Sequence, residues 1–158
     1  MPIFTPNCPE QRAFILDESR YVALIAGRGS GKTAAAAVKL LRYVGKYPGC
    51  RALVTAGINE QLVEGMIPQL EKWLPDGVVP KVRRKPYTRY LFPNDAEVIF
   101  RPCYNPESLR AGNFSYVEMD EAATCPEMAF QIADAACRQQ GYPPQVVITT
   151  TPRWQNWV

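Results

Sequence analysis

Histidine is absent from this 158-residue chain, and its five cysteines form no C-x-x-C pair. Structural zinc sites draw most of their ligands from Cys and His, so no zinc site is expected. An odd number of irregularly spaced cysteines also argues against a disulfide framework and favours reduced thiols, as in an intracellular protein. The cysteines are Cys8, Cys50, Cys103, Cys125 and Cys137.

Long apolar runs are missing as well. No segment approaches the roughly 18 apolar residues that a membrane-spanning helix needs, and the N-terminus lacks the basic and then apolar pattern of an export signal. We therefore expect a soluble protein with no membrane partner. The chain also lacks a strong charge of one sign, because its net charge is only +3. That excess is too small to indicate nucleic-acid binding by itself.

The residues that are present predict one globular domain, because 47% of the 158 residues are hydrophobic. Apolar strand patterns alternate with helical ones, which predicts an α/β fold with a mostly parallel sheet and helices on both faces. The expected strands span 21–26, 51–55, 115–120 and 145–149, and the expected helices span 32–43, 59–73 and 126–138. In the second helix, Asn59 is expected to cap the N-terminus and Pro68 to kink the axis.

Residues 80–101 interrupt the alternation. Apolar patterns at 90–92 and 97–100, separated by Pro-Asn-Asp, predict an inserted β-hairpin. Positive charge is concentrated nearby, and two interpretations of it stay open: a DNA-facing loop or a solvated hairpin. The cations are Lys81, Arg83, Arg84, Lys85 and Arg89.

A phosphate-binding loop follows the first expected strand. The sequence from Ala26 to Thr33 is AGRGSGKT, which matches G-x-x-x-x-G-K-[ST] except that Ala26 replaces the first glycine. In such loops the backbone N–H groups surround phosphate oxygens, the lysine neutralises the β- and γ-phosphates, and the hydroxyl binds Mg²⁺. A simple Gly-rich turn is disfavoured by the strand before it and the helix after it. The expected nucleotide-binding residues are Gly27, Arg28, Gly29, Ser30, Gly31, Lys32 and Thr33.

The strand at 115–120 ends in two adjacent carboxylates, Asp120 and Glu121. Neighbouring side chains on a strand point to opposite faces, so the two have different roles. We expect Asp120 to hold Mg²⁺ and Glu121 to polarise the water that attacks ATP. A solvated acidic turn would be the better interpretation without the phosphate loop. Glu118 is expected to pair with a neighbouring cation, and it receives no catalytic role. Together these motifs predict an ATPase that uses ATP and Mg²⁺.

Three threonines, Thr149, Thr150 and Thr151, end the last expected strand, just before Pro152. One interpretation is that a hydroxyl here senses the γ-phosphate or the attacking water. The other is an ordinary Thr-rich strand end followed by a proline stop.

With these motifs placed, nearly the whole chain resembles the ATPase motor domain of the large terminase subunit of tailed bacteriophages. The resemblance depends on the arginine-containing phosphate loop, the Ser-Leu-Arg-Ala-Gly segment at 108–112, the Asp120-Glu121 pair, the threonines before Pro152 and the segment at 6–14. It implies a P-loop NTPase fold of the ASCE type and a motor that moves double-stranded DNA into a procapsid. The implied partners are a homo-oligomeric ring, a portal and a small terminase subunit, in the cytoplasm of the infected bacterial host.

The same resemblance implies roles for single residues. Gln11 would read the adenine edge, Arg28 would respond to the γ-phosphate, and Arg110 would be an arginine finger that reaches a neighbouring subunit. Thr149, Thr150 and Thr151 would form the motif that couples hydrolysis to movement. The family usually places Gly directly after the finger, whereas Ala111 intervenes here before Gly112. Large terminases continue into lid and nuclease parts, so residues 1–158 are expected to be a P-loop ATPase fragment without nuclease activity.

Two further classes of function remain as alternatives. Among other P-loop enzymes, a helicase-like translocase needs a second domain, a kinase normally lacks the glutamate beside Asp120, and a GTPase needs an Asn-Lys-x-Asp motif that this sequence does not contain. The other class is a truncated nucleotide-binding assembly module with little turnover.

Overall fold

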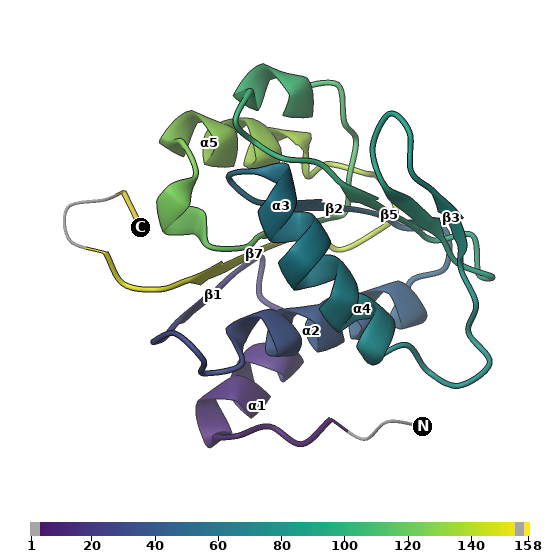
Figure 1. Ribbon diagram of the computed structural model, residues 1–158. Helices are drawn as coiled ribbons and strands as arrows, with labels where there is room; N and C mark the ends of the chain where they lie inside the picture. The colour runs from purple at the N-terminus through teal and green to yellow at the C-terminus, as the bar shows by residue number, and fades with distance from the viewer. Residues whose placement is uncertain (1–3, 154–156) are drawn as a thin grey trace.

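The computed structural model describes residues 4–153 and 157–158, which form a seven-stranded sheet between two helical layers (Figure 1). The strands are β1 (Tyr21–Ile25), β2 (Arg51–Thr55), β3 (Lys81–Arg83), β4 (Arg89–Leu91), β5 (Glu97–Phe100), β6 (Tyr116–Met119) and β7 (Gln145–Thr150). The helices are α1 (Pro9–Leu16), α2 (Lys32–Lys46), α3 (Asn59–Gln61), α4 (Ile67–Lys72) and α5 (Glu127–Ala136). A π-helical segment (Leu62–Met66) and two 3₁₀ turns (Pro106–Leu109 and Ala122–Thr124) complete the described elements.

The sheet order is β1-β7-β6-β2-β5-β4-β3. The first five strands of that order are parallel, and β4 and β3 add an antiparallel extension. Parallel strands end at the same edge, so the loops after β1, β6 and β7 lie together. Because β7 lies between β1 and β6, the threonines at its end are placed between the phosphate loop and the acidic pair. The predicted α/β class with a mostly parallel sheet is confirmed.

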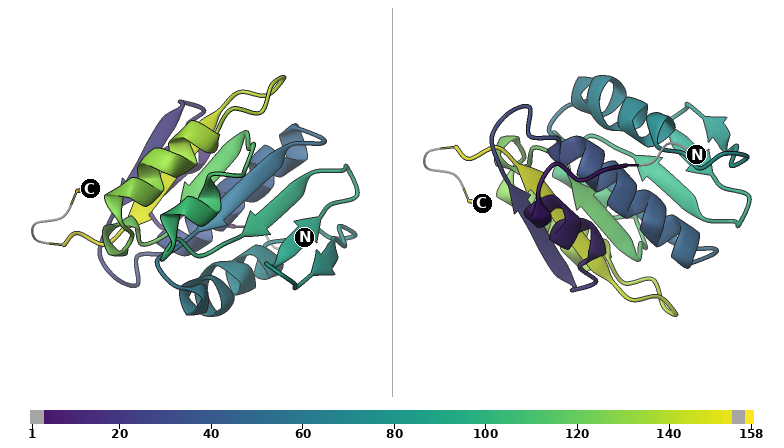
Figure 2. Two further views of the ribbon diagram at one scale, coloured as in Figure 1. Left: turned by 90° about the horizontal axis from the view of Figure 1, so that it is seen from above. Right: turned by 90° about the horizontal axis from the view of Figure 1, so that it is seen from below.

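Each face of the sheet is covered by its own apolar layer. Residues such as Val54 and Tyr116 point toward α1, α2 and α4, while their strand neighbours Leu53 and Val117 point toward α5. Figure 2 shows the two layers from above and below. Burial on both faces explains why the central strands are apolar throughout rather than alternating. Among the described residues, no helix is long and apolar enough to cross a membrane.

The helix expected at 59–73 is interrupted in the structure. Its middle, Leu62–Met66, is π-helical, and Pro68 lies in the first turn of α4. Proline has no N–H to donate and its ring crowds the carbonyl four residues earlier, so a widened turn before it relieves the conflict. The predicted Asn59 cap is wrong, because Ile58 occupies the N-cap position. The side-chain oxygen of Gln61 instead accepts a hydrogen bond from the Ile58 N–H at 3.2 Å.

The hairpin expected within 80–101 is present as β4 and β5, joined by a turn in which the Phe92 N–H donates to the Ala96 carbonyl. It extends the main sheet, because β5 pairs in parallel with β2. One α-helix and one strand were not predicted from the sequence: α1 and the edge strand β3. All three residues of β3 are exposed, so no apolar alternation marks it.

Candidate active site

The phosphate loop connects β1 to α2, and its glycines are required by its shape. Gly29 and Gly31 have φ angles of 72° and 81°, a region that L side chains rarely adopt. A Cβ atom on Gly31 would also lie 2.9 Å from the Gln11 amide nitrogen. Helix α2 starts at Lys32, so its first N–H groups and its positive dipole end face the loop. An anionic phosphate fits this arrangement.

Lys32 is buried and lies where the three loops meet. Its ammonium donates to the Gly27 carbonyl at 3.0 Å and to the Thr151 hydroxyl at 3.1 Å. The same nitrogen is 3.8 Å from a carboxylate oxygen of Glu121. Three predicted site residues from the loops after β1, β6 and β7 are thus brought together around one cation.

Asp120 is buried below this cluster. One carboxylate oxygen lies 3.4 Å from the Thr33 hydroxyl, and the other accepts a hydrogen bond from the Thr149 hydroxyl. Burial raises the pKa of Asp120, and the neighbouring Glu121 charge adds to that effect. A bound cation would favour the ionised form, and the oxygen atoms of Thr33 and Asp120 are the ligand type that Mg²⁺ prefers. The residues therefore fit the predicted magnesium site.

Glu121 is held in an unusual backbone conformation beside Asp120. Its φ and ψ angles are 47° and 48°, which is left-handed and uncommon for a residue other than glycine. Thr151 donates to both carboxylate oxygens, from its N–H at 3.2 Å and from its hydroxyl at 3.1 Å. The Thr124 hydroxyl donates to the Glu121 carbonyl at 2.8 Å. Strained backbones of this kind concentrate at functional sites, where surrounding contacts maintain them.

Gln11 is buried and braces the phosphate loop from α1. Its amide nitrogen donates to the Ser30 carbonyl at 2.6 Å, and its amide oxygen accepts from the Asn7 N–H at 2.8 Å. An amide offers two N–H groups and two acceptor positions, so each side of Gln11 keeps one for another partner. Adenine reading by Gln11 stays a prediction.

Arg28 lines a cavity of about 370 Å³ that opens beside Glu121 and Thr151. The remaining lining residues are Gln61, Thr124, Pro152 and Arg153. Sequence reasoning missed Gln61 and Thr124, which lie in segments without a recognisable motif. Arg153 had a signal, because it is a cation that follows the Thr-rich strand end after a single proline, Pro152. The cavity brings the predicted catalytic glutamate and two arginines to one opening.

Arg110 lies outside this cluster, just after the Pro106–Leu109 turn. It is exposed, and its guanidinium makes two hydrogen bonds to Glu107, at 2.7 and 2.9 Å. Gly112 is required nearby for a steric reason, since a Cβ atom there would lie 1.8 Å from the Phe114 ring. In the described part of the chain, no hydrogen bond or ion pair joins Arg110 to Glu121.

Glu118 is fully buried between the sheet and α2. Its hydrogen-bonding partner is the Tyr116 hydroxyl, at 3.0 Å. The cation Lys39 is near enough to lower the pKa of Glu118 by its charge, but no ion pair joins the two among the described residues. Burial raises the pKa of Glu118 to about 8, and the charge of Asp120 adds to this shift. The other carboxylate oxygen has no hydrogen-bonding partner among the described residues. Glu118 is a buried group of the core and lies beneath the site.

A model of the family described as terminase large subunit, T4likevirus-type, N-terminal, matches residues 23–158. The comparison with curated proteins gives no match. Among solved structures, the large terminase of a thermophilic bacteriophage is similar with a TM-score of 0.79 and 15% identity, over 94% of this chain and 40% of that one.

Two further solved structures are similar. The Thermus phage P74-26 large terminase ATPase domain has a TM-score of 0.63 and 21% identity, over 93% of this chain and 65% of that one. A chain of the bacteriophage Phi-29 viral genome packaging motor assembly has a TM-score of 0.62 and 16% identity, over 97% of this chain and 50% of that one. This chain therefore spans less than two thirds of the length of each of these three similar chains. At these identities the structural likeness shows the fold alone. The family match covers most of the chain, which therefore belongs to the terminase large subunit family, T4likevirus type, and corresponds to its N-terminal region.

Proposed function

We propose that this chain hydrolyses ATP and, as part of a ring motor, drives double-stranded DNA into a procapsid. The observation that carries the proposal is the meeting of Lys32, Glu121 and Thr151 at the phosphate loop, with Asp120 beneath them. Two solved structures support nucleotide binding, since the large terminase of the thermophilic bacteriophage occurs in complex with ADP and with ATP-gamma-S. The Phi-29 structure is named as a viral genome packaging motor.

The chain's own residues supply the parts of the reaction. The loop N–H groups and the α2 dipole bind the phosphates, while Lys32 neutralises charge that develops on the γ-phosphate. Glu121, oriented by two hydrogen bonds from Thr151, accepts a proton from the attacking water. Arg28 lies at the same opening and would contact the departing phosphate. Arg110 would act on a neighbouring subunit's nucleotide.

Thr33 and Asp120 would hold Mg²⁺. When bound, the ion supplies charge stabilisation at the β- and γ-phosphates. The remaining assignments rest on the family: Gln11 as the adenine reader, Thr149, Thr150 and Thr151 as the coupling motif, and residues 1–158 as the ATPase part. The proposed partners are DNA, a portal and a small terminase subunit, and the proposed location is the cytoplasm of an infected host.

Steady-state ATP hydrolysis tests the function directly. Glu121→Gln should lower kcat by roughly 10²–10⁴-fold, the usual contribution of a general base, while ATP still binds. Lys32→Ala should remove both binding and turnover. Glu60→Gln, at an exposed position on α3, is the matched control and should leave both unchanged. Hydrolysis that survives Glu121→Gln would place the base elsewhere.

A second candidate, a nucleotide-binding assembly module, is favoured by one observation: Arg110 lies at the surface and makes its hydrogen bonds to Glu107, outside the cluster around Lys32. It predicts tight ATP binding without turnover at any protein concentration, with or without duplex DNA. Detectable turnover that Glu121→Gln abolishes would exclude it.

A further inference from the structure

The antiparallel extension of the sheet collects cations on one face. Lys81 is paired with Leu91, and Arg83 is paired with Arg89. Leu91 in turn is paired with Glu97, which is in register with Arg51 of β2. Directly paired residues point to the same side of a sheet, and so do alternate residues of one strand. Arg51, Lys81, Arg83 and Arg89 therefore share one face, here called the basic face.

The opposite face of these strands is the packed one. Val82, Tyr90 and Val98 are in register there, and Tyr90 and Val98 are buried against the helices. The Tyr90 hydroxyl donates to Glu71 of α4. On the basic face, Lys81 and Arg83 are exposed and Leu91 is 40% exposed. Figure 2 (left) shows α5 above the β1 and β7 side of the sheet, away from β3 and β4. Ile99 of β5 is on the same face and is buried in the apolar cluster that includes Leu109.

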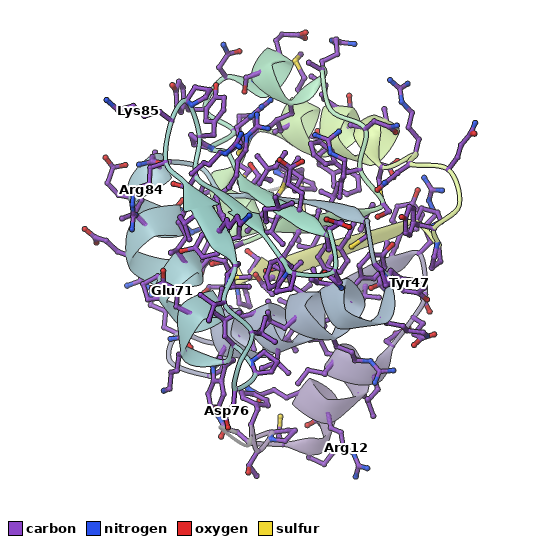
Figure 3. The ribbon with its side chains drawn as sticks, turned by 90° about the vertical axis from the view of Figure 1, so that its right-hand side faces the viewer. Arg12, Tyr47, Glu71, Asp76, Arg84 and Lys85 are labelled. Carbon is purple, nitrogen blue, oxygen red and sulfur yellow. The ribbon has the colours of Figure 1, made fainter. Side chains whose placement is uncertain are left out.

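The charges on this face are poorly balanced. Arg51 and Arg89 share a single carboxylate, Glu97, at 3.0 and 3.2 Å. Lys81 and Arg83 have no ion pair among the described residues. Arg84 and Lys85 follow β3 and project outward from the same edge of the sheet (Figure 3). Arg84 lies toward Tyr90 and α4, so it extends the positive charge around this edge. A cluster that repels itself in this way costs stability, so an anionic partner would relieve it.

Arg101, directly after β5, is another cation without a balancing carboxylate in the described part of the chain. Its guanidinium lies 4.3 Å from the Tyr87 ring centroid and donates to the Ser108 carbonyl. Its Nε is buried without a hydrogen-bonding partner. Within the described ranges it has no carboxylate at ion-pair distance. Burial lowers the pKa of Arg101, and the positive charges of Arg89 and Arg51 add to that effect.

We propose that the basic face binds the phosphate backbone of double-stranded DNA, which rests on the proposed function for the choice of partner. Four strands span about 14 Å at a spacing of about 4.8 Å. That width matches about four nucleotides of one DNA strand at a rise of about 3.4 Å each. The face is built from strands and, among the described residues, no helix projects from β3 or β4, so it suits contacts to phosphates rather than base edges. An acidic protein is less suited, since the centres of protein interfaces are depleted of charge.

Binding of a random-sequence DNA of about 30 base pairs, measured by fluorescence anisotropy across a salt series, tests the proposal. The variant Lys81→Gln/Arg83→Gln/Arg84→Gln/Lys85→Gln removes four exposed cations and leaves Arg101 to hold the Pro106–Leu109 turn. Its affinity at low salt should fall at least about tenfold, and its slope of log K against log[salt] should become shallower by about 0.9 per lost phosphate contact. The control Arg42→Gln/Lys46→Gln/Lys72→Gln/Arg138→Gln changes the net charge equally on other surfaces and should bind DNA much more like the wild type.

A second variant tests whether weaker DNA binding by the quadruple variant is caused by loss of folding. Glu97→Gln releases Arg51 and Arg89 from their carboxylate, so DNA binding should become several-fold tighter with a steeper salt slope. Equal affinity of the wild type, both quadruple variants and Glu97→Gln would overturn the proposal, as would absence of DNA binding by the wild type. A polyglutamate competitor that binds this face as tightly as DNA of equal charge would reassign it to an acidic protein.

ATP hydrolysis without DNA separates the two proposals. The first quadruple variant should keep the wild-type basal rate, because its four residues lie outside the active site. If the wild type hydrolyses no ATP but its DNA binding still depends on these cations, the motor assignment fails and the basic face stands. If ATP hydrolysis is normal and DNA binding does not depend on these cations, the proposed role of the basic face is wrong while the motor assignment stands.

Discussion

Thr151 shows how much one hydroxyl can contribute to this site. It accepts a hydrogen bond from Lys32 and donates one to Glu121, and its N–H donates to the other Glu121 oxygen. The hydroxyl therefore bridges a cation and an anion that also lie within ion-pair distance of each other, at 3.8 Å. Thr151 thus fixes the position of both the lysine and the glutamate at the phosphate loop.

Thr151→Val preserves the shape of the side chain and removes the hydroxyl. Hydrogen bonds to charged groups contribute about 1.5–3 kcal/mol, so kcat should fall by roughly 10- to 100-fold. KM for ATP should change little, because the loop N–H groups still bind the phosphates. Steady-state kinetics would show this split, with the exposed Thr5→Val as control. An unchanged kcat would mean that Thr151 positions nothing that the reaction uses.

At the scale of elements, α1 and α2 are tied together by a buried lysine. Lys39 of α2 donates to the carbonyls of Phe14 and Asp17 at the end of α1, the helix that carries Gln11. Burial lowers the pKa of Lys39 to about 8, while Asp17 and Glu118 oppose this shift. Charged neighbours at this end of α1 and α2 also include Glu18 and Arg42.

This shift predicts a pH dependence of folding stability. Between about pH 8 and pH 10.5 the unfolded chain binds a proton at Lys39 that the folded chain has released. The contribution of Lys39 to the free energy of unfolding therefore rises with pH across that window, by at most about 1.4 kcal/mol per unit. Urea unfolding of wild type and Lys39→Met at about pH 7.5, 8.5 and 9.5 measures it. The wild type should gain stability relative to the variant as pH rises, and a constant difference would contradict the assignment.

At the scale of the whole molecule, the position of Arg110 separates it from the nucleotide site of its own chain. It follows the Pro106–Leu109 turn and pairs with Glu107 at the surface. An exposed ion pair of this kind contributes little free energy, so Arg110 is easily released to another partner. This geometry suits an arginine that completes the site of a neighbouring subunit.

ATP turnover per subunit should therefore rise steeply with protein concentration. Arg110→Ala should remove that rise and lower the maximal rate by roughly 10³-fold or more, the typical effect of an arginine finger. Arg138→Ala, also at an exposed arginine, should behave as the wild type. A specific activity that stays constant over the whole concentration range would show that hydrolysis needs no neighbour.

The sequence by itself determined the parts of this protein that depend on local patterns. The AGRGSGKT loop, the Asp120-Glu121 pair after an apolar strand and the alternation of strands and helices are readable because backbone conformation and periodicity are local. The fold class follows from them.

The tertiary structure alone decided which distant residues meet. Thr151 joins Lys32 to Glu121, Gln11 braces Ser30, and β3 lines up its cations with those of β2 only because strand pairing brings together residues far apart in the chain. Register and crossover connections set those distances. Such pairing depends on the packing of the whole sheet, which no local stretch of sequence specifies.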